Sequence, residues 1–152
     1  MSAPQSLRRS MSDLRDVKKS AKEIYDQWRR ETICCPAFDG EAVVFSLKGW
    51  NHITGATGHK KRPLKDIQRR LALLPYAKQI IERSSTIQNI TVKGGLTFFA
   101  LEAVIKVEKA TLIEYKKIRV ILAEDKAGKK IFYSVMDKNS NSMGNKKGTP
   151  HA

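Results

Sequence analysis

Residues 96–107 read Leu-Thr-Phe-Phe-Ala-Leu-Glu-Ala-Val-Ile-Lys-Val, and every second side chain from Phe99 to Val107 is apolar. Successive side chains of a strand point to opposite faces, so this alternation predicts a strand with one buried face. Segments 86–92, 113–124 and 130–137 also read as strands. Residues 125–128, Asp-Lys-Ala-Gly, supply a turn between the last two. Because every connection is short, the sequence predicts an antiparallel meander of four strands.

Upstream of Ser84 the apolar period is helical. Leu14, Val17, Ala21, Ile24 and Trp28 step by three or four and predict a helix from Ser10 or Ser12 to about Thr32. A second helix is expected to begin at Pro63 and to end at Pro75, with a further turn or two over 76–83. Between these helices, 43–47 reads as a short strand and 55–58 as a glycine-rich loop. The fold class is therefore α+β, with N-terminal helices followed by a four-stranded antiparallel sheet.

The 152 residues correspond to one domain. We expect a flexible N-terminus over 1–10, a single domain over 11–138 and a disordered polar tail over 139–152. The adjacent Cys34 and Cys35 offer no disulfide framework and suit a reducing compartment. The sequence contains no apolar run of about 20 residues and no secretory signal pattern. These features predict a cytoplasmic protein that makes no membrane contact.

Charge gives the clearest indication of a partner. The chain has 29 Lys and Arg against 15 Asp and Glu, a net charge of +14. Segment 48–83 alone has nine cations and two acids, a local charge of +7. This clustering favours a surface that binds a polyanion, although a merely lysine-rich surface is the alternative interpretation. The candidate nucleic-acid-binding residues are Lys48, Trp50, His59, Lys60, Lys61, Arg62, Arg69 and Arg70.

The residues suit proton transfer better than metal chemistry. The sequence has no metal-binding, P-loop or GxGxxG motif, so we expect no metal and no other cofactor. RNA cleavage needs a base, an acid and cations, which histidine, lysine, arginine and hydroxyl side chains supply. If segment 50–52 is extended, His52 shares a side with Trp50, which would place a catalytic histidine beside a base-stacking ring. A histidine held by core packing is the alternative.

Strand alternation adds two further candidates. Arg119 lies between Ile118 and Val120, and Ser134 lies between Tyr133 and Val135, so each is expected to point away from its apolar neighbours. Both would then lie on the outer face of neighbouring strands and line a shallow groove. The alternative for each is a solvated strand residue.

Three segments resemble the barnase–EndoU–colicin–RelE-like nuclease superfamily, and within it the barnase-like members encoded by phages and mobile elements. They are 49–53 (Gly-Trp-Asn-His-Ile), 62–70 (Arg-Pro-Leu-Lys-Asp-Ile-Gln-Arg-Arg) and the hairpin containing 117–120 and 132–135. The resemblance covers roughly residues 40–138. It implies a small metal-independent ribonuclease with a barnase/RelE-like fold, often a toxin restrained by an immunity or antitoxin protein.

The resemblance also implies roles for four residues. His52 would be the acid–base histidine, Arg119 the transition-state cation and Ser134 the late-strand hydroxyl. Well-studied barnase-like enzymes use a glutamate base, for which Glu102 is the acid that the predicted sheet offers. In this chain Glu102 lies on the strand face opposite the stripe from Phe99 to Val107. That position allows Glu102 to act as the base but does not require it, and in this respect the chain departs from the family pattern.

We therefore expect an endoribonuclease that cleaves RNA by general acid–base transesterification, with tRNA or another structured RNA as target and an acidic immunity or antitoxin protein as partner. Two alternatives remain open. One is a non-catalytic nucleic-acid-binding module of a mobile element, and the other is an effector that binds an acidic host protein.

Overall fold

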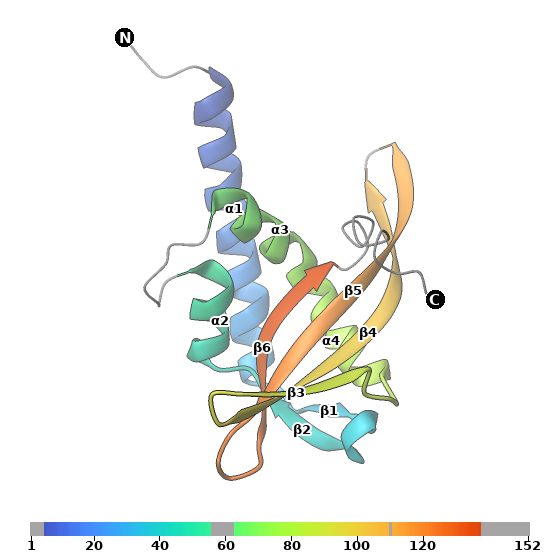
Figure 1. Ribbon diagram of the computed structural model, residues 1–152. Helices are drawn as coiled ribbons and strands as arrows, with labels where there is room; N and C mark the ends of the chain where they lie inside the picture. The colour runs from blue at the N-terminus through green and yellow to red at the C-terminus, as the bar shows by residue number, and fades with distance from the viewer. Residues whose placement is uncertain (1–4, 56–62, 110, 138–152) are drawn as a thin grey trace.

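The computed structural model describes residues 5–55, 63–109 and 111–137. The helices are α1 (Gln5–Arg29), α2 (Leu47–Thr54), α3 (Leu64–Leu73) and α4 (Ala77–Arg83), with 3-10 turns η1 (Pro36–Phe38) and η2 (Leu74–Tyr76). The strands are β1 (Ile33–Cys35), β2 (Glu41–Val44), β3 (Asn89–Lys93), β4 (Leu96–Lys109), β5 (Leu112–Glu124) and β6 (Lys130–Asp137). Figure 1 shows α1, α3 and α4 behind a curled sheet, with β3 crossing in front of it.

The predicted α+β class is confirmed, but the observed sheet is larger than the predicted sheet of four antiparallel strands. Within the described residues the sheet has six strands in the order β1-β2-β6-β5-β4-β3. The four expected strands form the antiparallel meander β3 to β6. β1 pairs antiparallel with β2, and β2 pairs parallel with β6 through Val43 and Val44. β2 overlaps the short strand expected over 43–47, although the sequence did not indicate its place in the sheet. β1 was not predicted, because three residues are too few to show an alternation.

One face of the sheet packs on the helices. Alternate residues of β4, β5 and β6 point into the core, where they meet the apolar stripes of α1, α3 and α4. The largest fully buried side chains include Tyr25, Phe132, Ile81, Leu101 and Leu122. Of the predicted helical stripe, Ala21 and Trp28 are buried and Leu14 and Ile24 are partly buried, but Val17 is 40% exposed. α1 begins at Gln5, within the segment expected to be flexible. The tail expected over 139–152 lies outside the described residues.

The opposite face of the sheet is concave at one end because β3 and the start of β4 curl toward β6. Gly94 and Gly95 form the tight turn between β3 and β4, and both have positive φ angles, 61° and 81°, that favour glycine. Phe98 of β4 consequently reaches Tyr133 of β6, with ring centroids 5.1 Å apart. This curl, rather than the helices, provides one wall of the candidate site.

Candidate active site

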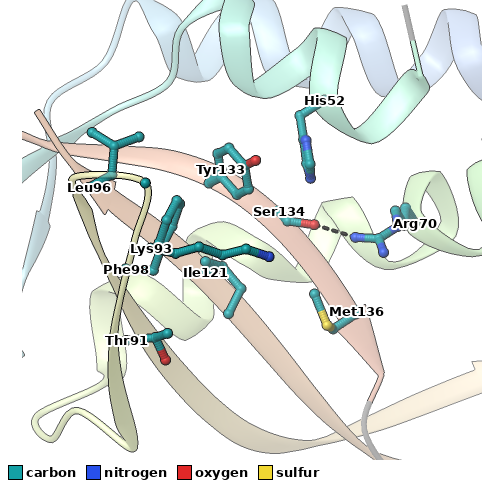
Figure 2. A pocket seen from close by; sticks show the side chains of 11 residues that line it. His52, Arg70, Thr91, Lys93, Leu96, Phe98, Ile121, Tyr133, Ser134 and Met136 are labelled. Carbon is teal, nitrogen blue, oxygen red and sulfur yellow. Dashed lines mark hydrogen bonds between the residues drawn. The ribbon is translucent and has the colours of Figure 1, made fainter. Parts of the chain in front are cut away.

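A pocket of about 470 Å³ lies where α2, α3 and the curled sheet meet. Its polar lining consists of His52, Arg70, Thr91, Lys93 and Ser134. Its apolar lining consists of Leu96, Phe98, Ile121, Tyr133 and Met136. Figure 2 shows His52 descending from α2, Arg70 approaching from α3 and Lys93 reaching in from the β3 side. Residues from four separate parts of the chain therefore converge on one cavity.

His52 lies on a helix, so the prediction of an extended segment at 50–52 is wrong. α2 begins after the extended Ser46 and ends at Gly55, whose positive φ of 74° closes the helix. Residues two apart on a helix point about 200° apart, so Trp50 and His52 lie on opposite sides. His52 faces the pocket, whereas the Trp50 ring is 6% exposed and packs against Tyr25. The structure thus gives Trp50 a core role and does not present its ring for base stacking.

Gly49 explains why α2 lies so close to β6. A Cβ atom at this position would lie 2.4 Å from the Phe132 carbonyl oxygen and 2.7 Å from the Tyr25 hydroxyl. Only a glycine allows this approach, since real Cβ contacts are not that short. The close packing fixes the height of α2 above β6 and with it the position of His52.

Arg70 joins α3 to β6 at the pocket. Its Nη1 donates hydrogen bonds to Ser134 Oγ and, at 3.4 Å, to the Val135 carbonyl oxygen. Asp66, one turn earlier on α3, accepts from Arg70 Nε at 3.1 Å. The Arg70 side chain is only 14% exposed, so its charge is held in a partly desolvated place. Arg70, which was expected to bind phosphates at the surface, thus lies directly beside the hydroxyl group of Ser134.

A β-bulge corrects the prediction that Ser134 points away from Tyr133. Ile121 pairs with Ser134 and Leu122 pairs with Phe132, so Tyr133 is an extra residue on β6. A bulge breaks the simple alternation of side chains, and here both Tyr133 and Ser134 line the pocket. Ser134 is also 1% exposed, which contradicts the alternative of a solvated strand residue.

Three rings meet at the pocket. His52 stacks on Tyr133 with centroids 4.0 Å apart and an interplanar angle of 29°. Tyr133 in turn contacts Phe98 at a tilt of 59°. Stacking of this kind restricts the plane of the imidazole. His52 is therefore held by packing on one side while it lines an open pocket on another. The packing interpretation is partly met, and the catalytic role of His52 stays a prediction.

Arg119 and Glu102 lie on the outer face of the sheet but do not line the pocket. They face each other across β5 and β4, and Arg119 Nε donates to Glu102 Oε2 at 2.6 Å. Lys117 Nζ lies 3.8 Å from the other Glu102 oxygen. The side chains of Arg119 and Glu102 are 20% and 11% exposed. This arrangement engages the Glu102 carboxylate with two cations and gives no support to its role as general base.

The remaining predicted binding residues are dispersed or lie outside the described residues. Lys48 is exposed on α2 and lines a smaller neighbouring pocket, and Arg69 is exposed on α3. His59, Lys60, Lys61 and Arg62 lie outside the described residues.

Four residues that line the pocket were not predicted from the sequence as part of the site: Thr91, Lys93, Phe98 and Tyr133. The Gly94-Gly95 pair is a signal for the β3–β4 turn, but only the curl of the sheet brings Lys93 over β6.

Among the described residues, no group of three or more His, Cys, Asp or Glu side chains is placed to hold a metal ion. Across the same part of the chain, no helix combines the length and apolar character needed to cross a membrane. Comparison with protein-family models, with curated proteins and with solved structures found no match. The resemblance to the nuclease superfamily and the cytoplasmic location stay predictions.

Proposed function

We propose that this protein is a metal-independent endoribonuclease and that the pocket beside His52 is its active site. The observation that carries the proposal is the convergence of an imidazole, a guanidinium, an ammonium and a hydroxyl group on one open cavity, from His52, Arg70, Lys93 and Ser134. The net charge of +14 supports a polyanionic substrate. A barnase-like ancestry agrees with the α+β class and the antiparallel meander but is not needed for the chemistry.

The proposed reaction is an internal transesterification. The ribose 2′-OH attacks the adjacent phosphorus, the bond to the 5′-oxygen breaks, and the products carry a 2′,3′-cyclic phosphate and a 5′-hydroxyl. His52 takes the 2′-OH proton, because an imidazole exchanges protons near neutral pH. The leaving 5′-oxygen needs a proton in return, and the Lys93 ammonium is the candidate donor within the pocket.

Arg70 and Ser134 stabilise the charge that builds on the phosphoryl oxygens. The Arg70 guanidinium is held in place by Asp66 and Val135 before substrate arrives, so little reorganisation is needed during reaction. Ser134 accepts from Arg70 and can donate its own O–H to a phosphoryl oxygen. In this arrangement Arg70 takes the role that the resemblance implied for Arg119.

The test is cleavage of a fluorescent RNA oligonucleotide by purified protein in the presence of EDTA. Wild-type protein should cleave it, and His52→Ala and Arg70→Gln should each reduce the rate by about 100-fold or more, the usual range for one acid–base or charge-stabilising group. Arg30→Gln, which removes an exposed arginine after α1, is the matched charge control and should keep the rate.

Three outcomes would contradict the proposal. Full activity of His52→Ala would remove His52 from the chemistry, and loss of wild-type activity in EDTA would show metal dependence. Salt-sensitive RNA binding without cleavage at any pH would indicate a non-catalytic nucleic-acid-binding module. If cleavage is confirmed, toxicity on expression that His52→Ala relieves would support the toxin role that the resemblance implies, and a co-purifying acidic protein would support the expected immunity or antitoxin partner.

A further inference from the structure

The apolar side chains that line the pocket take no part in the proposed phosphate chemistry. Leu96, Phe98, Ile121 and Tyr133 line it on the side away from Arg70, and Met136 lies beside Arg70 and Ser134. A phosphodiester is a charged group that gains nothing from apolar walls, whereas burial of apolar side chains and a ligand ring against each other is favourable. The volume of about 470 Å³ lies in the range of pockets that bind small molecules, and it exceeds what a phosphate alone would fill.

The arrangement of the aromatic rings indicates which chemical group of a ligand would bind against the apolar side chains. Phe98 and Tyr133 meet at 59°, so their rings form two walls of a corner rather than a closed stack. His52 stacks on Tyr133, with ring centroids 4.0 Å apart and an interplanar angle of 29°. Nucleobases bind to proteins by stacking on aromatic side chains, and each such contact tolerates any base because all bases have a π-face. Phe98 is only partly buried and lines the pocket, as a stacking surface requires.

We propose that Phe98 and Tyr133, with Leu96 and Ile121, form a subsite for one unpaired nucleobase next to the scissile phosphate. This inference rests on the proposed function and names its substrate class: RNA that is single-stranded or looped at the cleavage point. In a duplex the bases are paired and stacked inward, so none can enter the corner beside Phe98 without leaving the helix. The base would lie against the apolar walls while its phosphate reaches His52, Arg70 and Ser134.

The first experiment measures binding without cleavage. NMR titrations compare uridine 3′-monophosphate with ribose 5-phosphate and inorganic phosphate, using wild-type protein, Phe98→Leu and Val104→Ala. Val104 is 63% exposed on the same strand and serves as the control. The nucleotide should bind about tenfold more tightly than ribose 5-phosphate, the size expected for one base–aromatic stack. Phe98→Leu should remove this advantage, and Val104→Ala should keep it.

The second experiment measures cleavage of three RNA substrates of one sequence: a single strand, a duplex, and a single strand with an abasic nucleotide at the scissile position. The single strand should react at least about tenfold faster than either of the others. Phe98→Leu should raise KM more than it lowers kcat, because the ring binds the base and does not touch the reacting phosphate. Thermal melting of each variant separates these effects from loss of the fold.

The outcomes distinguish the two proposals. If nucleotides bind with a Phe98-dependent advantage but no RNA is cleaved, the subsite stands and the nuclease proposal falls. If RNA is cleaved in a His52-dependent way but the duplex and the abasic strand react as fast as the single strand, the nuclease proposal stands and the subsite falls. Equal binding of nucleotide and ribose 5-phosphate also overturns the subsite.

Discussion

Arg70 on α3 donates a hydrogen bond to Ser134 on β6, although the two residues are 64 positions apart in the chain. Neither residue is fully solvated, since Ser134 is 1% exposed and the Arg70 side chain is 14% exposed. Asp66 holds the other edge of the same guanidinium. The contact therefore links the helical layer to the sheet within the lining of the pocket.

Ser134→Ala should weaken both the fold and the proposed reaction. Loss of the hydroxyl removes one acceptor from a partly buried guanidinium, which should lower the free energy of unfolding by about 1–3 kcal/mol. Urea denaturation of Ser134→Ala, Arg70→Gln and the double variant measures the coupling between the two side chains. Strictly additive effects of the two substitutions would show that this hydrogen bond contributes nothing to stability.

Arg119→Gln should act mainly on stability. It breaks the ion pair with Glu102 and leaves a carboxylate that is 11% exposed with weaker neutralisation, so the free energy of unfolding should fall by about 1–3 kcal/mol. The rate of RNA cleavage should stay within a few-fold of wild type at a temperature where the variant is folded. A loss of cleavage as large as that of Arg70→Gln, with an unchanged circular dichroism spectrum, would instead place Arg119 in the reaction.

Gly49→Ala should destabilise the protein because its Cβ would collide with the Phe132 carbonyl oxygen and the Tyr25 hydroxyl. Overpacking of this kind costs about 1–3 kcal/mol. Asn51→Ala, on the same helix, is the control and should have a smaller effect, which thermal melting can compare. An unchanged melting temperature for Gly49→Ala would show that α2 can move away from β6 without cost.

Tyr25 should make the fold sensitive to alkaline pH. Burial raises the pKa of the Tyr25 hydroxyl well above its usual range, and this hydroxyl donates to the Ser46 carbonyl oxygen at 2.5 Å. A tyrosine in the unfolded chain ionises near pH 10, whereas folded Tyr25 stays protonated there. Unfolding therefore releases a proton above about pH 10, so stability is fully present below that pH and falls as pH rises.

The measurement is the free energy of unfolding from urea titrations at several pH values from 8 to 11. Tyr25→Phe should show a shallower decrease above about pH 10 than wild type, after its lower overall stability is taken into account. Tyr115→Phe is the control, because Tyr115 is 67% exposed, and it should keep the wild-type slope. Identical slopes for all three proteins would refute the role of Tyr25.

Much of the fold was readable from local sequence. The alternation from Phe99 to Val107 and the stripe from Ala21 to Trp28 predicted the central strand and the long helix, because each pattern reports which side of an element is buried. Local pattern failed at α2, where eight residues with a glycine at position 49 are too few to show a helical period. It also failed at Tyr133, because a bulge depends on the register with a partner strand.

The sequence by itself determined the α+β class, the antiparallel meander, the basic charge and the candidates His52 and Ser134. Only the tertiary structure decided which cation joins them. Arg119 is neutralised across the sheet by Glu102, while Arg70 reaches Ser134 and the curl of β3 delivers Lys93. The physical reason is that periodicity assigns a side chain to a face, but the distance between two side chains depends on how separate elements pack, which no single segment encodes.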